Sequence, residues 1–256
     1  MTNVQRPSNL LFATDIGRGL IGLGTYFASL PIFRMAAKGD NHPVLVLPGF
    51  GAGDFSTRPL RYFLRQQNFT PYEWKLGRNL GGVAFLDSII DRAKEIAHQH
   101  GQKISIVGWS LGGVYAREIA RNHPEIIRQV ITLGSPFRHV GSGNNIKWLY
   151  ETVSKDKIST IDPQLIADMK VTPPVPTTAI YTKGDGIVSW ECCIEAKEDH
   201  QTQNVEVSGS HCGLGHNPAV LFCIADRLAQ AEGYWRKFQP NVLQKHLYQD
   251  LKLHLG

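Results

Sequence analysis

Short apolar runs alternate with amphipathic segments along most of the chain. Apolar residues are concentrated at 44–47, 103–107 and 128–134, as expected for strands that are buried on both faces of a sheet. Residues 84–99 and 111–122 instead carry apolar side chains at helical spacing. Because strand and helix alternate, we expect an α/β fold with a mostly parallel central sheet flanked by helices.

The regularity lapses over about residues 137–175, which carry only weak helical signals, and it then returns. Strands are predicted at 177–182 and 204–209, and a last helix is predicted to start after Asn217, a residue type that caps helices. We therefore interpret residues 137–175 as an insertion in one domain.

The domain predicted in this way has two flanks. Residues 42–232 make up the α/β core, including the insertion. Residues 1–41 are predicted to form an N-terminal helical segment that packs on the core, and residues 233–256 a C-terminal helical tail. The chain length of 256 residues suffices for one large domain.

Residues 19–33, GLIGLGTYFASLPIF, are uncharged and mainly apolar. This run is shorter than the roughly 20 residues that span a bilayer. Leu20, Leu23, Phe27 and Leu30 fall on one helical face, which predicts a helix that packs on the domain through them. The alternative is an interfacial helix that gives weak association with a membrane surface.

Composition and charge narrow the functional classes. Hydrophobic residues make up 42% of the chain and charged residues 19%, which is ordinary for a globular protein. The net charge of +5 comes without a run of lysine or arginine, so we expect no nucleic-acid partner. The four cysteines, Cys192, Cys193, Cys212 and Cys223, lack Cys-x-x-Cys spacing, so we expect reduced thiols and no bound metal. We identify no secretory signal, so we expect a cytoplasmic protein. If the interfacial alternative holds, that protein is peripheral to the membrane.

One turn carries candidate chemistry. Gly108-Trp109-Ser110-Leu111-Gly112 follows a predicted strand and precedes a predicted helix. A Gly-x-Ser-x-Gly turn in this context is typical of a nucleophile elbow, which lifts the serine out of the sheet in a strained conformation. A serine hydroxyl needs a base and an oxyanion-stabilising site before it can attack a carbonyl. We therefore predict that Ser110 is a nucleophile.

The partners of Ser110 should follow in the order acid, then histidine. Asp185 comes directly after the strand at 177–182, and it is the predicted acid; its simplest other role is that of a turn residue before glycine. Two histidines lie between the last strand and the last helix. We predict His211 as the base and keep His216 as the alternative.

An oxyanion hole requires two backbone amides. One is expected from Leu111, the residue after the nucleophile, and the other from the loop after the first core strand, which nominates Phe50. From its position in the turn, Trp109 is predicted to shape the pocket.

Over residues 42–231 these motifs resemble the α/β-hydrolase fold, and in particular its bacterial lipase- and esterase-like members. VLVLPGF resembles their oxyanion loop, although many lipases carry histidine where Pro48 stands here. GWSLGG resembles the nucleophile elbow, GDGIV the acid loop and GSHCGLGHNP the histidine loop. The resemblance implies that the insertion at 137–175 is a short lid, with Trp148, Leu149 and Tyr150 lining an acyl site; packing of the lid alone is the other interpretation of these three residues.

The resemblance implies a serine hydrolase that needs no cofactor and cleaves a small-molecule or lipid carboxylic ester through an acyl-enzyme. Ser110 would attack the carbonyl, His211 would transfer the proton and Asp185 would orient the imidazole. Two alternatives stay open. The same triad passes the acyl group to an alcohol in an acyltransferase, and a hydrolase-fold binding protein performs no chemistry.

Overall fold

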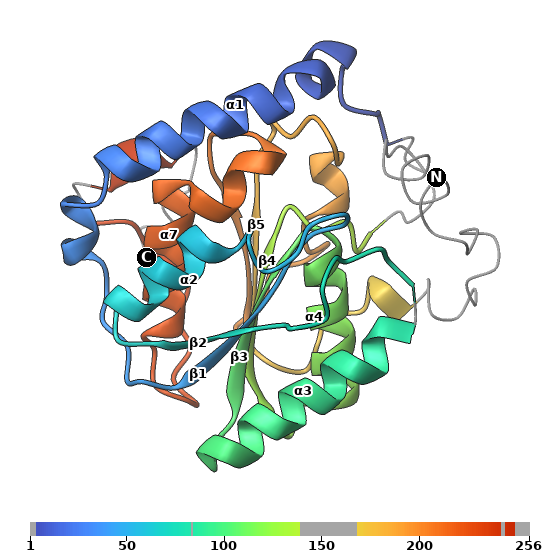
Figure 1. Cartoon of the computed structure of the whole chain (residues 1–256), viewed down its shortest axis with the longest axis vertical. Coiled ribbons are helices and arrows are strands. Elements are labelled where there is room, and N and C mark those ends of the chain that lie inside the picture. The colour runs from blue at the N-terminus through green and yellow to red at the C-terminus, as the bar shows by residue number, and fades with distance from the viewer. Residues whose placement is uncertain (1–3, 83, 139–167, 242–243, 249–256) are drawn as a thin grey trace.

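The computed structural model describes residues 4–82, 84–138, 168–241 and 244–248. At its centre is one sheet of six strands in the order β2-β1-β3-β4-β5-β6 (Figure 1). Every neighbouring pair is parallel, which confirms the predicted α/β fold with a parallel sheet. The strands are β1 (Pro43–Leu47), β2 (Thr70–Glu73), β3 (Ile104–Trp109), β4 (Ile127–Leu133), β5 (Thr177–Tyr181) and β6 (Thr202–Glu206).

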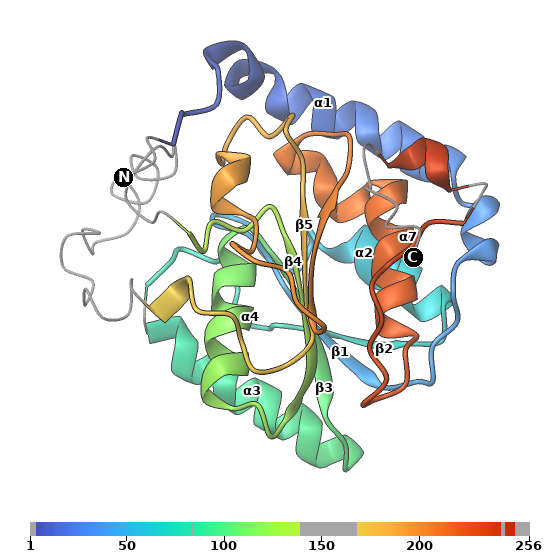
Figure 2. The same ribbon diagram turned by 180° about the vertical axis from the view of Figure 1, so that it is seen from behind.

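Helices cover both faces of this sheet (Figures 1 and 2). Val44 and Val46 of β1 belong to the apolar core on one face, whereas Leu45 and Leu47 belong to the core on the other. Both faces of the strand are therefore buried, which explains why its sequence is a continuous apolar run. The first face carries α2 (Arg58–Gln66), α7 (Pro218–Leu228) and part of α1 (Asn9–Ala28), and the second carries α3 (Ala84–His100) and α4 (Leu111–Asn122).

The strand order places a switch point between β1 and β3. The chain goes from β1 to one side of the sheet to form β2, and it then crosses to the other side to form β3. In open parallel sheets, ligands bind beyond the carboxyl ends of the strands at such a point. The loop after β1 and the turn at Ser110 after β3 both lie there.

The helix α1 crosses the carboxyl end of the sheet and packs on the short 3-10 helix η4 (His211–His216) (Figure 1). It begins at the cap Ser8 and is 20 residues long. Its buried residues are Asp15, Gly19 and Tyr26. Gly19 allows a close approach, since a Cβ atom there would lie 2.9 Å from Cβ of Cys212.

The predicted packing face of this helix is wrong. Leu20 and Phe27 were expected to be buried against the domain, but each is 63% exposed. The small residue Gly19 and the hydrogen-bonding Asp15 face the domain in their place. A stripe of apolar residues predicts burial only when no other contact holds the helix closer to the domain. Here Gly19 and Asp15 make such contacts with the backbone of the domain.

Two further expectations differ from the structure. The last strand ends at Glu206, before the predicted residue 209. In the described part of the tail, residues 233–241 and 244–248, one 3-10 turn (η5, Lys245–Leu247) stands where a helix was predicted. Among the described residues, no helix has the length and apolar character needed to cross a membrane.

Candidate active site

Ser110 stands in a strained turn between β3 and α4. Its backbone angles are φ 52° and ψ −121°, in a region that non-glycine residues rarely occupy. The flanking glycines allow the turn, because a Cβ atom on Gly108 would lie 2.4 Å from Cα of Gly113, and one on Gly112 would lie 2.5 Å from the carbonyl oxygen of Leu47. The N–H of Ser110 donates a 2.8 Å hydrogen bond to the carbonyl of Leu133, which ties the turn to β4.

Asp185 and His211 are brought together from two different loops. Oδ1 of Asp185 accepts hydrogen bonds from the N–H groups of Ile187, at 2.8 Å, and Val188, at 2.7 Å. Its Oδ2 accepts a 2.7 Å hydrogen bond from Nδ1 of His211. This bond leaves Nε2 as the ring nitrogen available to a further partner. Both side chains are almost fully buried.

A glycine makes room for this pair. Gly134 directly follows β4 and has φ +54°, and a Cβ atom there would lie 3.2 Å from Oδ2 of Asp185 and 3.2 Å from Nδ1 of His211. Both the backbone conformation and the neighbouring pair therefore favour glycine at this position.

The electrostatic surroundings favour a charged imidazole. Burial alone would lower the pKa of His211, but the charge and hydrogen bond of Asp185, with the charge of Asp15, raise that pKa above its ordinary value. A histidine in this setting is a stronger base than one in water.

His216, the alternative base, lies elsewhere. Its Nε2 donates a 2.8 Å hydrogen bond to the backbone carbonyl of Gly19 on α1. Burial lowers its pKa. The structure thus brings His211, and not His216, to Asp185.

A second Ser–His–Asp series stands at the opposite end of β3. Nδ1 of His42 donates to Asp40 at 2.5 Å, and Nε2 of His42 lies 2.9 Å from the hydroxyl of Ser105. His42 and Ser105 are completely buried, and neither lines any of the cavities described below. Burial and the charge of Arg128 lower the pKa of His42. This series joins the residue before β1 to β3, and its histidine and serine are both closed off from solvent.

Ser110 and His211 line one cavity of about 430 Å³ at the carboxyl end of the sheet. The predicted oxyanion residues Phe50 and Leu111 line the same cavity, as does Trp109. The predicted acyl-site residues Trp148, Leu149 and Tyr150 lie outside the described part of the chain. The structure therefore gathers the other predicted site residues around one space, with Asp185 behind His211.

No family model matches the sequence. The fold, however, is similar to those of solved lipases. Aspergillus fumigatus lipase B superimposes with a TM-score of 0.60 and 17% identity over 75% of this chain and 53% of its own, so the chain spans about half of that lipase. Paleococcus ferrophilus monoacylglycerol lipase gives a TM-score of 0.54 and 13% identity over 75% of this chain and 96% of its own. Bacillus licheniformis lipase BlEst2 gives a TM-score of 0.52 and 12% identity over 76% of this chain and 94% of its own.

The chain has the α/β-hydrolase fold. The six parallel strands and these structural neighbours agree on it.

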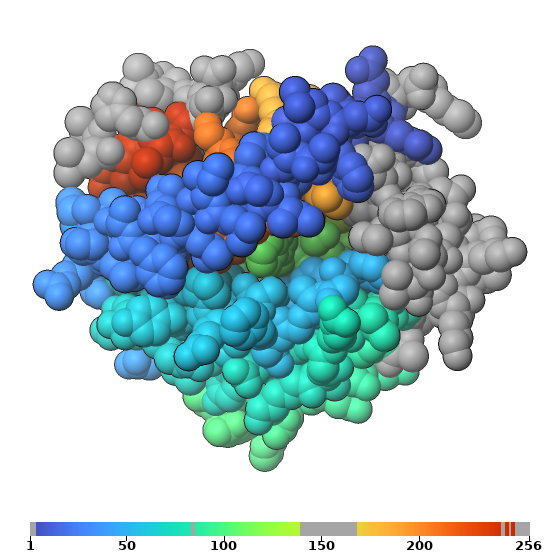
Figure 3. Space-filling view, turned by 45° about the horizontal axis from the view of Figure 1, so that its top comes forward, coloured from blue at the N-terminus to red at the C-terminus, as the bar shows by residue number. Residues whose placement is uncertain are grey.

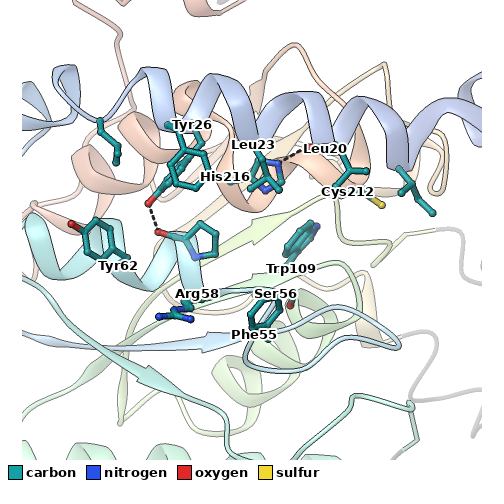
Figure 4. Close-up of a pocket in the computed structure, with 15 residues that line it drawn as sticks. Leu20, Leu23, Tyr26, Phe55, Ser56, Arg58, Tyr62, Trp109, Cys212 and His216 are labelled. Carbon is teal, nitrogen blue, oxygen red and sulfur yellow. Dashed lines mark hydrogen bonds between the residues drawn. The ribbon is translucent and has the colours of Figure 1, made fainter.

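A second, larger hollow of about 750 Å³ lies beside the Ser110 cavity. It is mainly apolar, and it runs between α1 and α2, where the space-filling view shows a hollow below the blue ridge of α1 (Figure 3). The two spaces share Ile16, Ser56, Trp109 and Cys212 as lining residues, so they are neighbours across Trp109. We call the larger one the α1 groove; it is also lined by Gly19, Leu20, Leu23, Tyr26, Phe27, Leu30, Phe55, Arg58, Pro59, Tyr62 and His216 (Figure 4).

Asn79 has a structural role beside the predicted oxyanion loop. It is buried, and its Nδ2 donates a 2.9 Å hydrogen bond to the carbonyl of Pro48. Its backbone N–H donates to Ala52 at 2.7 Å, and its carbonyl accepts from Gly51 at 2.6 Å. Asn79 thereby fixes the loop that contains Phe50. No local motif marks such a residue, since its partners lie about thirty positions earlier.

Proposed function

We propose that this protein of α/β-hydrolase fold is a serine hydrolase that cleaves carboxylic esters through an acyl-enzyme. One observation carries the proposal. A serine in a strained strand–helix turn shares a cavity with a histidine whose other ring nitrogen is held by a buried carboxylate. Nucleophile, base and orienting acid in this arrangement are the components of a Ser–His–Asp triad. The lipase structures with the same fold are consistent with it.

In the proposed reaction, Oγ of Ser110 attacks the ester carbonyl carbon while Nε2 of His211 takes the hydroxyl proton. The N–H groups of Phe50 and Leu111 stabilise the negative charge on the carbonyl oxygen. The tetrahedral intermediate collapses, the carbon–oxygen bond to the alcohol breaks, and His211 returns its proton to the leaving alcohol. Asp185 keeps the imidazole in the required tautomer throughout.

Water completes the cycle. It attacks the acyl-serine carbonyl as His211 accepts one of its protons, and the second tetrahedral intermediate releases the carboxylic acid. The proton then returns to Ser110. No group other than water is needed to balance this step.

The α1 groove supports an ester with a long apolar part. Its volume of about 750 Å³ falls in the range of small-molecule sites, and aliphatic and aromatic side chains dominate its lining. In Figure 4 Leu20, Leu23 and Tyr26 of α1 stand across the groove from Phe55 and Arg58, with Trp109 between them. A chain that leaves the Ser110 cavity past Trp109 enters this groove. Acyl chains gain about 0.8 kcal/mol for each methylene removed from water.

The outer surface of α1 supports delivery of that ester from a lipid surface. Leu10, Ile16 and Ile21 are 73%, 65% and 74% exposed. The helix has two charged residues, Asp15, which is buried, and Arg18, whose side chain is 31% exposed. The exposed side of the helix is thus almost free of charge, next to the groove. An uncharged apolar surface of this kind suits an acyl–water interface.

The test is hydrolysis of p-nitrophenyl esters from acetyl to palmitoyl by three proteins. Ser110→Ala should lose several orders of magnitude in kcat, because the nucleophile is gone. Ser105→Ala is the matched control, since it removes a buried histidine-bonded hydroxyl from the same strand without touching the cavity. It should keep the activity of the wild type per folded molecule.

The wild type should react with a fluorophosphonate at Ser110, and it should prefer the longer esters. Equal activity of Ser110→Ala and wild type would refute the proposed function. Labelling of Ser110 without turnover would point to an acceptor or a substrate that the ester series does not supply.

Delivery from a lipid surface has its own test, flotation of the protein with phosphatidylcholine vesicles. The variant Ile21→Asn should float less than the wild type, because it places a polar group on the exposed side of α1. Equal flotation of the two proteins would contradict this part of the proposal.

A further inference from the structure

A buried carboxylate on α1 has no role in the reaction just described. Asp15 is fully buried in an otherwise largely apolar helix. Its Oδ2 accepts hydrogen bonds from the N–H of Gly186 at 2.8 Å and the N–H of His211 at 3.0 Å. Its Oδ1 accepts from the N–H of Cys212 at 2.9 Å. One side chain therefore bonds both to the neighbour of Asp185 and to the backbone of His211 itself.

Arg18, one turn further along α1, joins the same two loops. Its Nη1 donates to the carbonyl of Gly184 at 2.8 Å and to the carbonyl of Gly209 at 3.2 Å. Its Nη2 lies 3.4 Å from Oδ2 of Asp15. Together the two side chains accept from and donate to residues on both sides of the Asp185–His211 hydrogen bond. We call this arrangement the α1 clamp.

Glycines bring the helix and the two loops into close contact. A Cβ atom on Gly186 would lie 2.2 Å from the carbonyl oxygen of Leu11 on α1. A Cβ atom on Gly184 would lie 2.3 Å from the carbonyl oxygen of Gly209, which places the two loops against each other. Contacts this close leave little room for one loop to move relative to the other.

The carboxylate is held in its charged form. Burial alone would raise the pKa of Asp15, but hydrogen bonds from the N–H groups of Cys212, Gly186 and His211 lower it below the ordinary value. A buried charge is a costly way to dock a helix, because well-packed apolar residues serve as well or better for stability. Its three hydrogen bonds fix the position of α1 relative to the two loops, because hydrogen bonds are directional and apolar contacts are not.

We propose that Asp15, assisted by Arg18, is a positioning residue that sets the distance between the loop of Asp185 and the loop of His211. The proposal rests on the proposed function. Neither residue is required to touch the substrate's reacting atoms. The clamp acts on the chemical step, because a triad that is displaced by about 1 Å loses on the order of 10²-fold in rate.

Asp15 also contributes charge. Asp185 faces His211 from the loop after β5, Asp15 and Arg18 face η4 from α1, and Cys212 follows His211 in η4. The negative charge of Asp15 helps to keep the imidazole protonated. Replacing Asp15 by a neutral residue should therefore lower the pH at which His211 becomes active as a base.

The experiment compares Asp15→Asn with the wild type for kcat, KM and the pH dependence of kcat/KM on p-nitrophenyl butyrate. Asparagine has nearly the same shape, but its NH₂ group must face at least one of the three N–H donors. We expect kcat to fall by about 10²-fold with KM nearly unchanged, and the acidic midpoint of kcat/KM to move to lower pH. Arg18→Met is the second variant; its residue is partly exposed, so the protein should fold, and a smaller loss of kcat is expected.

The matched control is Glu195→Gln. Glu195 is also buried and paired with an arginine, Arg117, but it lines neither the Ser110 cavity nor the α1 groove. It should lower thermal stability without moving the pH midpoint or kcat of the folded enzyme. Thermal unfolding of every variant distinguishes a protein that does not fold from a folded protein whose triad is displaced.

Two results would overturn the clamp. A folded Asp15→Asn and a folded Arg18→Met with the kcat and pH midpoint of the wild type would refute it while leaving the proposed function intact. A wild-type protein without any Ser110-dependent turnover would refute the proposed function first, and the catalytic meaning of the clamp with it. If Asp15→Asn does not fold, Arg18→Met alone decides.

Discussion

Gly134 gives the sharpest prediction, because one added methyl group would strain the backbone and also crowd Asp185 and His211. It follows β4 with φ +54° and lies against the Asp185–His211 pair. Gly134→Ala adds a single methyl group, which costs about 1–2 kcal/mol in stability from the left-handed backbone conformation alone. The new Cβ would also lie 3.2 Å from Oδ2 of Asp185 and from Nδ1 of His211, and 2.8 Å from Cδ1 of Leu214.

The magnitude of the second effect follows from these distances. The pair must move by a few tenths of an ångström to restore ordinary contact. If a displacement of about 1 Å costs on the order of 10²-fold, then this shift costs about three- to tenfold in kcat. Unlike the stability loss, the loss of kcat should persist in molecules that are fully folded.

Gly101→Ala is the control, because Gly101 has a similar φ of +59° and a Cβ atom there would have no neighbouring atom within 4 Å. It carries the same backbone strain without crowding the pair. The assay is urea unfolding of each variant, followed by kcat on p-nitrophenyl butyrate at about 25 °C. If Gly134→Ala matches Gly101→Ala in both measurements, the geometric reasoning about the pair is wrong.

Three further predictions concern the proposed enzyme. The acidic midpoint of kcat/KM should lie above the ordinary histidine value of 6.5, because the raised pKa of His211 means that the neutral base forms only at higher pH; a midpoint below 6.5 would contradict the assignment. Asn79→Ala should lower kcat and leave KM nearly constant, since it frees the loop of Phe50, and it should cost about 1–3 kcal/mol in urea unfolding through unpaired buried groups. Leu23→Trp should shorten the preferred acyl chain, with kcat/KM falling about fourfold for each methylene displaced from the groove and unchanged for the acetyl ester; a uniform loss across the series would argue against the groove.

The sequence was informative where function depends on local order. Ser110 follows a strand, Asp185 follows a later one, and the last loop holds a histidine, so order along the chain was enough to nominate the serine and the acid. It left His211 and His216 as alternatives for the base. Parallel strands bring all their carboxyl ends to one edge, and this converts order into proximity.

The sequence was misleading where contacts are distant. The apolar stripe of α1 suggested a buried face, whereas the helix docks through Asp15 and Gly19. An aspartate and an arginine one turn apart in a largely apolar helix were the available signal, but nothing in the local pattern names partners 171 to 197 positions away. Hydrogen bonding by itself would also have misled, since His42 with Asp40 and Ser105 forms a similar series that opens onto neither cavity.

Those separations also bear on how the protein is made. The helix α1 is synthesised before Gly186, His211 and Cys212, the partners of Asp15, which lie 171 to 197 positions further along the chain. At a synthesis rate of about 5–20 residues per second, the partners of α1 are made about 10–40 s after the helix itself. During that interval its apolar side chains have no native groove to line, and the ion pair of Asp15 and Arg18 has no loops to join. The site can thus assemble only after the loops of Asp185 and His211 have been synthesised, and until then α1 presents unpaired apolar side chains of the kind that chaperones shield in nascent chains.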